Sequence, residues 1–537
     1  GHVPTIGSGA RYRYRLDGAE SYPDPASRSQ PEGVHGPSEV VDPDRYVWHD
    51  AGWEGVVQKD LVFYELHVGT FSPEGTFRGV QERLPYLRDL GVTAVELMPV
   101  ADFPGRWNWG YDPAALYAPS RAYGTPDDLR ALVDAAHGLG LAVFLDVVYN
   151  HLGPDGAYLP VFAPMFTDRH HTPWGQTMNL DDEHGDGVRA LFIDNALHWL
   201  REYHFDGLRL DATHALVDER PTHFLAELSE AVAALESLPR TRSVVPRRYL
   251  IAEDERNMST LVLPREQGGY GLDGVWADDF HHLVRHLTAG DEAGYFADYA
   301  GTTAHDVART LMRGWFYEGQ RSPSQQKPRG TDAGPVEWDQ CVICIQNHDQ
   351  VGNRPAGSRL SDDVPLNVYR AVSALLLFAP ELPLLFMGQE WAATTPFLYF
   401  TDHNAELGRL VTQGRKAEYK DFPGFDGDVP DPQDPATFER SRLRWDEPKR
   451  PPHAGVLALY RRLLALRPQL TGTFSAEAHG DHGLVVRQGD HSLVVALAGG
   501  TSVPIPDEAT VVWHTEEEAF AEEGASPARQ GGVLFFP

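Results

Sequence analysis

Acidic side chains recur in this sequence at the ends of short apolar runs. Asp146, Asp211, Glu253 and Asp349 each lie at the end of a different run. A single acidic residue in such a place most often caps the helix that follows a strand. Four converging carboxylates raise one another's pKa and destabilise a fold, so their grouping favours a function. Hydrolysis of a glycosidic bond requires two carboxyl groups with separated proton affinities.

The spacing of these groups indicates a separate task for each. Arg209 and Asp211 are two residues apart, so on a strand they face the same side. The guanidinium would hold Asp211 ionised and fit to attack an anomeric carbon. Glu253, crowded by Asp211 and Asp349, would have a raised pKa and protonate the leaving oxygen, then deprotonate water. With Asp349 stabilising the cationic transition state, these steps retain the anomeric configuration.

Aromatic residues follow the second apolar run in the loop 103–113. Trp107, Trp109 and Tyr111 lie there among glycines. Large aromatic rings stack on the apolar faces of sugars, but they also anchor loops. We expect Tyr111 to contact a sugar, and both interpretations stay open for the two tryptophans.

The apolar runs predict a parallel sheet. They are rich in β-branched residues and alternate little, as expected of strands covered on both faces. Between them lie stretches of helical period, one of which begins with the helix-start pattern Thr125-Pro126-Asp127-Asp128. Eight such units favour a closed (β/α)8 TIM barrel, an α/β fold, because a doubly wound sheet would need a glycine-rich phosphate loop that is absent from the sequence. The runs are 61–68, 94–100, 142–148, 207–211, 248–253, 273–279, 341–349 and 382–390.

Three segments fall outside the barrel pattern. Residues 152–186, rich in Pro, Gly, His and Asp, are too long for a plain connection and predict a small subdomain inserted after the third strand. The catalytic barrel spans 51–470, and 471–537 predict a C-terminal antiparallel β-sandwich domain. Residues 1–50 contain one alternating strand and are expected to be the remnant of an N-terminal β-sandwich module with its linker.

The composition excludes several classes of partner. A formal charge of −31 at pH 7 gives no support for binding nucleic acid or an anionic membrane. No stretch approaches the roughly 20 apolar residues that span a bilayer, and the first residues lack a signal-peptide core, so we expect a cytoplasmic protein. Cys341 and Cys344, three apart on an expected strand, point to opposite faces and are interpreted as core residues. No cofactor is expected, and the sequence leaves the oligomeric state unknown.

Four segments together resemble the α-amylase family of glycoside hydrolases. They are DVVYNH (146–151), GLRLDATH (207–214), IAED (251–254) and QNHD (346–349), and their order along the barrel is that of the family. The resemblance implies that Asp211 is the nucleophile, Glu253 the general acid/base and Asp349 the transition-state stabiliser. It also implies an α-glucan substrate and a short motif of the inserted subdomain at MNLD (178–181). The substrate contacts expected from this matching are Tyr111, His151, Arg209 and His348, together with Asp146, Asn150 and Trp109.

Longer strings resemble one subgroup of this family, which cuts the α-1,4 bond beside the terminal trehalose of maltooligosyltrehalose. Among them are FYELHVGTFSPEGTF (63–77) and NHDQVGNR (347–354). By this resemblance Asp279, His281 and His282 are interpreted as contacts on the leaving-group side, with a packed loop as the alternative. His214-Ala215 stand where many relatives carry Lys-His, which is compatible with a different leaving group.

Two other functions stay open at this stage. A glycogen-branching or debranching enzyme would share the barrel, the carboxylates and an appended N-terminal module. A catalytically silent member that binds glycans or acts as a scaffold would keep the fold alone, and the intact carboxylate set argues against it. Asn150 matches one ligand position of the structural calcium common in this family, but the remaining ligands cannot be assigned, and we expect no required metal.

Overall fold

The computed structural model describes residues 6–18, 20–172, 175–236, 246–420, 429–499, 501–505, 511–521 and 533–536. Eight parallel strands close into a barrel, because the last strand pairs with the first. Each of the eight apolar runs contains one of these strands, so the predicted barrel is confirmed. The strands are β5 (Phe63–Leu66), β6 (Ala94–Leu97), β9 (Ala142–Val147), β12 (Gly207–Leu210), β13 (Tyr249–Glu253), β14 (Gly274–Trp276), β15 (Cys341–Cys344) and β16 (Leu382–Phe386).

Alternate residues of each strand face the barrel interior. Phe63, Phe144 and Ile251 pack with one another in an interior cluster, whereas their neighbours Tyr64 and Leu145 join the larger core under the helices. The two-residue period then places the next interior positions, toward the carboxyl ends, on polar residues. These positions are Glu65, Glu96, Asp146, Arg209 and Glu253, so the floor of the barrel's carboxyl end is charged.

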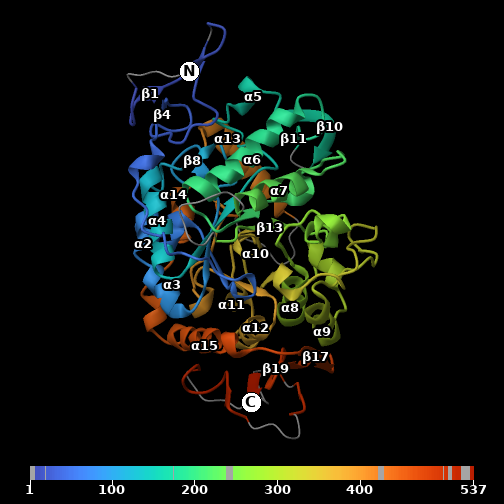
Figure 1. Ribbon diagram of the computed structural model, residues 1–537. Coiled ribbons are helices and arrows are strands. Elements are labelled where there is room, and N and C mark those ends of the chain that lie inside the picture. The colour runs from blue at the N-terminus through green and yellow to red at the C-terminus, as the bar shows by residue number, and fades with distance from the viewer. Residues whose placement is uncertain are drawn as a thin grey trace.

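Helices surround the barrel (Figure 1). The predicted helix start at Thr125 is confirmed, since its hydroxyl and the Asp128 carboxylate form a capping box with Pro126 in the first turn. The longer barrel helices are α3 (Leu84–Leu90), α4 (Pro126–Gly138), α6 (Gly185–Glu202), α7 (Phe224–Glu236), α8 (Asp279–Ala289), α9 (Ala304–Arg313), α12 (Leu366–Phe378), α13 (Ala405–Glu418) and α15 (His453–Leu466). Short helices of four to six residues are α1 (Val68–Phe71), α2 (Phe77–Gln81), α10 (His348–Gly352), α11 (Leu360–Asp363) and α14 (Pro435–Arg440).

The inserted segment and the N-terminal segment lie together at one end of the molecule (Figure 1). The insertion contains α5 (Leu159–Phe162) and the hairpin β10 (Phe166–Thr172) with β11 (Gly175–Met178). The N-terminal segment forms two short ladders, β1 (Arg11–Tyr12) with β4 (Ser38–Glu39) and β2 (Tyr14–Arg15) with β3 (Ser21–Tyr22). The domain boundaries drawn from the sequence stay a prediction.

An antiparallel sheet lies at the opposite end of the molecule, beside α15 (Figure 1). Its strand order is β17 (Phe474–His479), β18 (Gly483–Gln488), β19 (His491–Ala496), β21 (Val533–Phe536) and β20 (Trp513–His514). β18 and β19 are joined by a turn at Gly489-Asp490. The described part of 471–537 is one sheet, and barrel helices α9 and α12 take the place of a second layer on its inner face.

Two smaller expectations concern the buried cysteines and the membrane. Cys341 packs in the core under the helices and Cys344 in the barrel interior, so they face opposite sides of β15 as predicted. Among the described residues, no helix combines the length and the apolar character needed to cross a bilayer. The cytoplasmic location stays a prediction.

Candidate active site

Arg209 lies at the centre of the charged floor. Its side chain is fully buried, and its Nη1 donates to both oxygens of Asp146 at 2.9 and 2.8 Å and to Asp211 Oδ1 at 2.7 Å. Its Nη2 lies 3.5 Å from Glu253 Oε2. The guanidinium also lies over the Trp276 ring, 4.3 Å from its centroid. One guanidinium from β12 therefore contacts three carboxyl groups on β9, β12 and β13.

Asp211 is held as an ionised carboxylate. Burial by itself would raise its pKa, but Arg209, His151 and Asn150 together lower it. Asn150 Nδ2 donates to Asp211 Oδ2 at 2.7 Å, so each carboxylate oxygen accepts one hydrogen bond. A nucleophile needs such a charge and such a fixed orientation, and the assignment of Asp211 as the nucleophile stays a prediction.

Glu253 is held in its protonated form at neutral pH. Burial raises its pKa to about 8; Arg209 acts in the opposite direction, while Asp211, Asp349 and Asp278 raise the pKa further. The Ala212 amide donates to its Oε2 at 2.5 Å, which fixes the carboxyl group next to Asp211. The two neighbouring carboxyl groups thus have opposite protonation states, as hydrolysis of a glycosidic bond requires.

Tyr111 and His348 form the wall beside Asp146. The Tyr111 ring stacks on His348 with centroids 5.1 Å apart, and its hydroxyl donates to Asp146 Oδ2 at 2.6 Å. His348 Nε2 lies 2.8 Å from the same hydroxyl. His151 lies behind this wall, since its Nε2 contacts the Tyr111 carbonyl oxygen at 2.7 Å and its Nδ1 contacts Asn150. Tyr111, His151 and His348, three of the substrate contacts expected from the sequence, thus lie next to one another.

Asp349 opens toward solvent. Its side chain is 42% exposed, and Asn353 Nδ2 donates to its Oδ1 at 2.8 Å. Asp349 and Glu253 line a cavity of about 240 Å³. The other lining residues come from the loops after strands β12 to β15 and are His214, Glu255, Asp278, His282, Tyr295, Tyr299, Arg329, Gln350 and Asn353. The carboxyl group of Glu253 therefore faces a cavity that reaches solvent beside Asp349.

The chain matches known proteins over most of its length. The family model described as alpha amylase, catalytic domain, matches residues 21–161. A malto-oligosyltrehalose trehalohydrolase from Deinococcus radiodurans is 51% identical over 468 residues, which cover 86% of this chain and 74% of that protein. The chain belongs to the malto-oligosyltrehalose trehalohydrolase family. Another family member from Arthrobacter ramosus is 46% identical, with 86% of this chain and 79% of the relative covered.

Solved structures agree with this family assignment. A Salmonella typhimurium protein described as an alpha amylase is 38% identical, with a TM-score of 0.90 over 99% of this chain and 91% of that one. The pullulanase from Paenibacillus barengoltzii, at 20% identity and a TM-score of 0.63 over 96% of this chain and 82% of that one, supports the fold alone.

At the end of the sixth strand, Asp279 takes the packed-loop alternative, whereas His282 reaches the cavity. Asp279 is fully buried and accepts hydrogen bonds from Asn257, Tyr299 and the backbone of the 316–317 segment, so the structure gives its carboxylate a packing role. His281 is 1% exposed, and His282 lines the cavity. Trp276 of β14 faces the barrel interior, and the two-residue period of a strand puts residue 278 on the same side. Asp278, and not Asp279, therefore faces the cavity.

The tryptophans of the loop 103–113 take the loop-anchoring alternative. Trp109 is 3% exposed, stacks on Phe397 with centroids 5.0 Å apart and donates from Nε1 to the Leu398 carbonyl at 2.8 Å. Trp107 likewise stacks on Phe438. The expected sugar contact of Trp109 therefore disagrees with its buried position, and Tyr111 is the aromatic of this loop that reaches the carboxylates.

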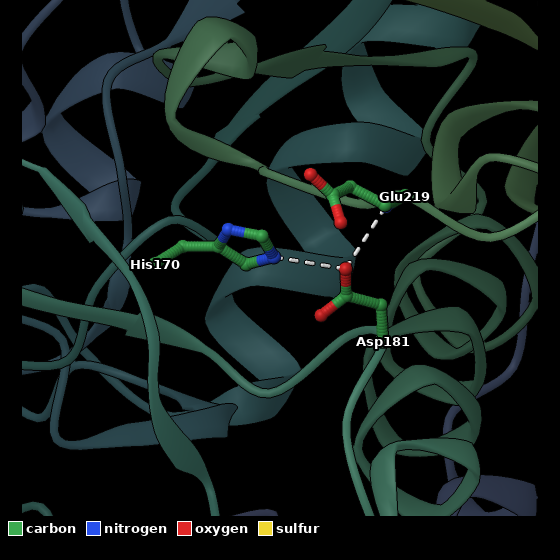
Figure 2. Close-up of side chains that lie close together, drawn as sticks. All are labelled: His170, Asp181 and Glu219. Carbon is green, nitrogen blue, oxygen red and sulfur yellow. Dashed lines mark hydrogen bonds and ion pairs between the residues drawn. The ribbon is translucent and has the colours of Figure 1, made fainter.

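One group of side chains has metal-ligand chemistry (Figure 2). His170, Asp181 and Glu219 place one ligand atom each within 4.8 Å of one another. However, His170 Nε2 and the Glu219 amide both donate to Asp181 Oδ2 at 2.9 Å, and the Arg169 guanidinium pairs with both carboxylates. The Arg169 guanidinium thus already pairs with both carboxylates of this group. Asn150, the one residue that matched a calcium position, is hydrogen bonded to Asp211.

Two further residues of the site were missed from the sequence. Glu65, in β5, accepts hydrogen bonds from the ring and the backbone of His348, and Asp278 faces the cavity. The two-residue parity that joined Arg209 to Asp211 would have found both, because it applies equally to β5 and β14.

Proposed function

We propose that this protein hydrolyses the α-1,4-glucosidic bond beside the terminal trehalose of maltooligosyltrehalose, with retention of configuration, releasing trehalose and a maltooligosaccharide. The observation that carries the chemistry is the single Arg209 guanidinium in contact with both Asp211 and Glu253, whose pKa values are shifted in opposite directions. Close carboxyl groups of opposite protonation suit a retaining double displacement.

In the first step Asp211 Oδ attacks the anomeric carbon while Glu253 gives its proton to the glucosidic oxygen. The bond from the anomeric carbon to that oxygen breaks, and the released product carries the proton. In the second step Glu253, now ionised, takes a proton from water, and the hydroxide attacks the anomeric carbon to release Asp211. The Asp349 carboxylate, at the open side, stabilises the positive charge on the sugar ring in both steps.

The wall of the site orients the sugar that is attacked. Tyr111 offers its ring as a stacking surface beside His348, and His151 holds the Tyr111 backbone from behind the wall. Arg209, Asp146 and Asn150 hold Asp211 in place. These contributions are positional, so each supplies less of the rate than the carboxyl pair.

The leaving group occupies the cavity on the open side. Asp278, His282 and Tyr295 line it together with Glu253 and supply polar groups and one aromatic surface for two sugar rings. The choice of trehalose as the leaving group is supported by the identity with relatives named malto-oligosyltrehalose trehalohydrolase. The branching alternative has a more distant relative, a 1,4-alpha-glucan branching enzyme from Nocardia farcinica that is 30% identical over 72% of this chain.

Product analysis tests this proposal. Purified protein is incubated with maltotriosyltrehalose, with maltopentaose as a matched substrate that lacks the trehalose end, and with amylopectin. We expect free trehalose from the first substrate at a rate far above any cleavage of the second, and the new sugar end initially in the α-configuration by proton NMR. Transfer or cleavage of α-1,6 branches without release of trehalose would instead identify a branching or debranching enzyme. Binding of all three without turnover would identify a silent glycan-binding protein.

A further inference from the structure

Glu65 is a buried carboxylate that the proposed mechanism does not use. It lies at the end of β5, on the side of the barrel floor away from β12, and is 1% exposed. Its neighbour in register on β6 is Glu96, also 1% exposed. A buried pair of carboxyl groups on adjacent strands is unfavourable unless one of them is neutral or paired with a cation.

Glu65 and Glu96 differ in their hydrogen-bond partners. Both oxygens of Glu96 lack a hydrogen-bond partner, and burial together with the nearby Glu65 raises its pKa well above the ordinary value. Glu96 is therefore neutral. Glu65 accepts two hydrogen bonds, one from the His348 amide at 2.9 Å to Oε2 and one from His348 Nδ1 to Oε1. Glu65 thus uses both of its oxygens as acceptors for His348.

The single hydrogen of the Tyr111 hydroxyl indicates the protonation state of His348. The phenol has one hydrogen, which it donates to Asp146 Oδ2 at 2.6 Å. The 2.8 Å contact between the same oxygen and His348 Nε2 must then be a hydrogen bond donated by Nε2. Because Nδ1 donates to Glu65, both ring nitrogens carry a hydrogen, and the ring is an imidazolium.

The charges around the ring agree with this state. Burial would lower the pKa of His348, but Glu65 and Asp349 raise it to about 9, and Arg209 acts in the opposite direction. His348 Nε2 lies 3.7 Å from Asp349 Oδ1. The other titratable groups that face the ring from neighbouring elements are Glu96 on β6, Asp146 on β9, Tyr111 on the loop after β6 and His67 after β5.

We propose that Glu65 is a positioning residue that keeps His348 as an imidazolium, so that Nε2–H points into the active site as a permanent donor beside Asp349. The cation then offsets the negative charge of Asp349 and Asp146, and its donor orients Tyr111 and a hydroxyl of the bound sugar. The consequence for activity rests on the proposed hydrolytic function, whereas the protonation state of His348 does not.

The substitution Glu65→Gln tests this device in two ways. Glutamine has the same shape but no charge and a single acceptor oxygen for the two His348 donors. Loss of the charge should lower the pKa of His348 from about 9 by about 3 units, because burial is then opposed chiefly by Asp349, so that the ring is neutral at pH 8. We expect kcat/KM to fall about threefold at pH 5.5 and about 100-fold at pH 8, since a neutral ring loses its Nε2 donor.

Two matched variants separate this effect from lost stability. Glu65→Asp keeps the charge on a shorter side chain and should retain the alkaline limb of the parent at a lower rate. Glu390→Gln removes another fully buried carboxyl group, which accepts from Tyr64 and Tyr86, and should leave the pH profile unchanged. A Glu65→Gln profile that is parallel to the parent at every pH would show a merely structural role and overturn the proposal.

A direct titration does not depend on turnover. In the full chain with isotope-labelled histidine, the His348 ring signal is identified by its loss in His348→Gln. We expect the parent ring to stay charged past pH 8 and the Glu65→Gln ring to titrate at or below the ordinary histidine value of 6.5. A parent ring that titrates at or below 6.5 overturns the proposal even if trehalose is released as proposed, and a charged ring supports it even if the protein proves inactive.

Discussion

Two buried histidine–carboxylate clusters lie at opposite ends of the same barrel. At the amino-terminal end, His137 contacts Asp50 from Nδ1 and Asp206 from Nε2, each at 3.0 Å, and stacks on Trp53. At the carboxyl end, His348 contacts Glu65 from one nitrogen and the Tyr111 hydroxyl from the other.

The two clusters differ in where the second nitrogen points. In the first, both nitrogens meet carboxylates, and Asp206 also accepts from Trp53, Arg248 and the Val143 amide, so the cluster ties the segment before the barrel to its base. In the second, one nitrogen is directed at the residues of the cavity. The same pair of residue types therefore stabilises the fold at one end and prepares a reaction at the other, as the ends of such barrels generally do.

The largest expected effect follows from removing the nucleophile at the carboxyl end. Asp211→Asn keeps the shape of the side chain but removes its charge, so kcat should fall about 10⁴-fold or more. The melting temperature and the affinity for a maltooligosaccharide should stay close to those of the parent. Steady-state kinetics with calorimetry measures all three, and an active variant would refute the assignment of Asp211.

The matching change at the amino-terminal end should act on stability alone. Asp206→Asn removes the buried carboxylate that pairs with Arg248 and leaves His137 with Asp50 alone, so it should lower the free energy of unfolding by about 3 kcal/mol. The kcat/KM of the folded variant should equal that of the parent. Urea unfolding and kinetics in parallel check this, and a comparable loss of activity would contradict the separation of the two ends.

The pH dependence of this stability has a defined sign. His137 has a raised pKa despite its burial, because of Asp206 and Asp50, so its contribution is complete below its ordinary value of 6.5 and is lost as the pH rises through the folded value. Burial by itself would raise the pKa of Asp206, but His137 and Arg248 lower it below the ordinary value of 3.8. The contribution of Asp206 to stability is therefore lost as the pH falls below 3.8. The difference between parent and variant should be greatest between these two values.

The pH profile of the parent enzyme gives the next largest effect. Glu253 must be protonated and has a pKa of about 8, so kcat/KM should decline above that pH and fall about 100-fold by pH 10. Asp211 must be ionised and has a lowered pKa, so the acid limb should lie below its ordinary value of 3.8. In Glu253→Gln the decline that begins near pH 8 should disappear together with most of the rate, and the remaining alkaline decline should follow His348, whose pKa is about 9.

Asp278 and Asp279, at the end of one strand, allow the same comparison between a residue of the site and a residue of the core. Asp278→Asn, at the cavity, should reduce kcat/KM for a trehalose-ended substrate about tenfold without loss of stability. Asp279→Asn, in its buried set of hydrogen bonds, should lower the free energy of unfolding by about 2 kcal/mol with less effect on the leaving group. The opposite pattern would restore the interpretation made from the sequence.

The smallest effect is expected far from both clusters. Thr125→Ala removes the hydroxyl of the capping box at the start of α4 and should lower the free energy of unfolding by about 1 kcal/mol. Activity at every pH should be that of the parent. This variant calibrates how a purely local loss appears in the same assays.

The sequence alone determined the barrel and the order of its reactive groups. Apolar runs separated by helical periods are local patterns, and each run became a strand of the closed barrel. The two-residue spacing of Arg209 and Asp211 is equally local, so their shared face was predictable. The same two-residue spacing also predicts that Asp278 faces the cavity and Asp279 the core.

Only the tertiary structure decided the protonation states and the partners of these groups. Glu65 and His348 are 283 residues apart in sequence and meet because the barrel closes, which no local pattern contains. The raised pKa of Glu253 depends first on its burial and then on charges from three other strand ends. Trp109 was covered by Phe397 from a distant loop. Burial and charge at a site are sums over the whole fold, and for that physical reason they could not be read from spacing.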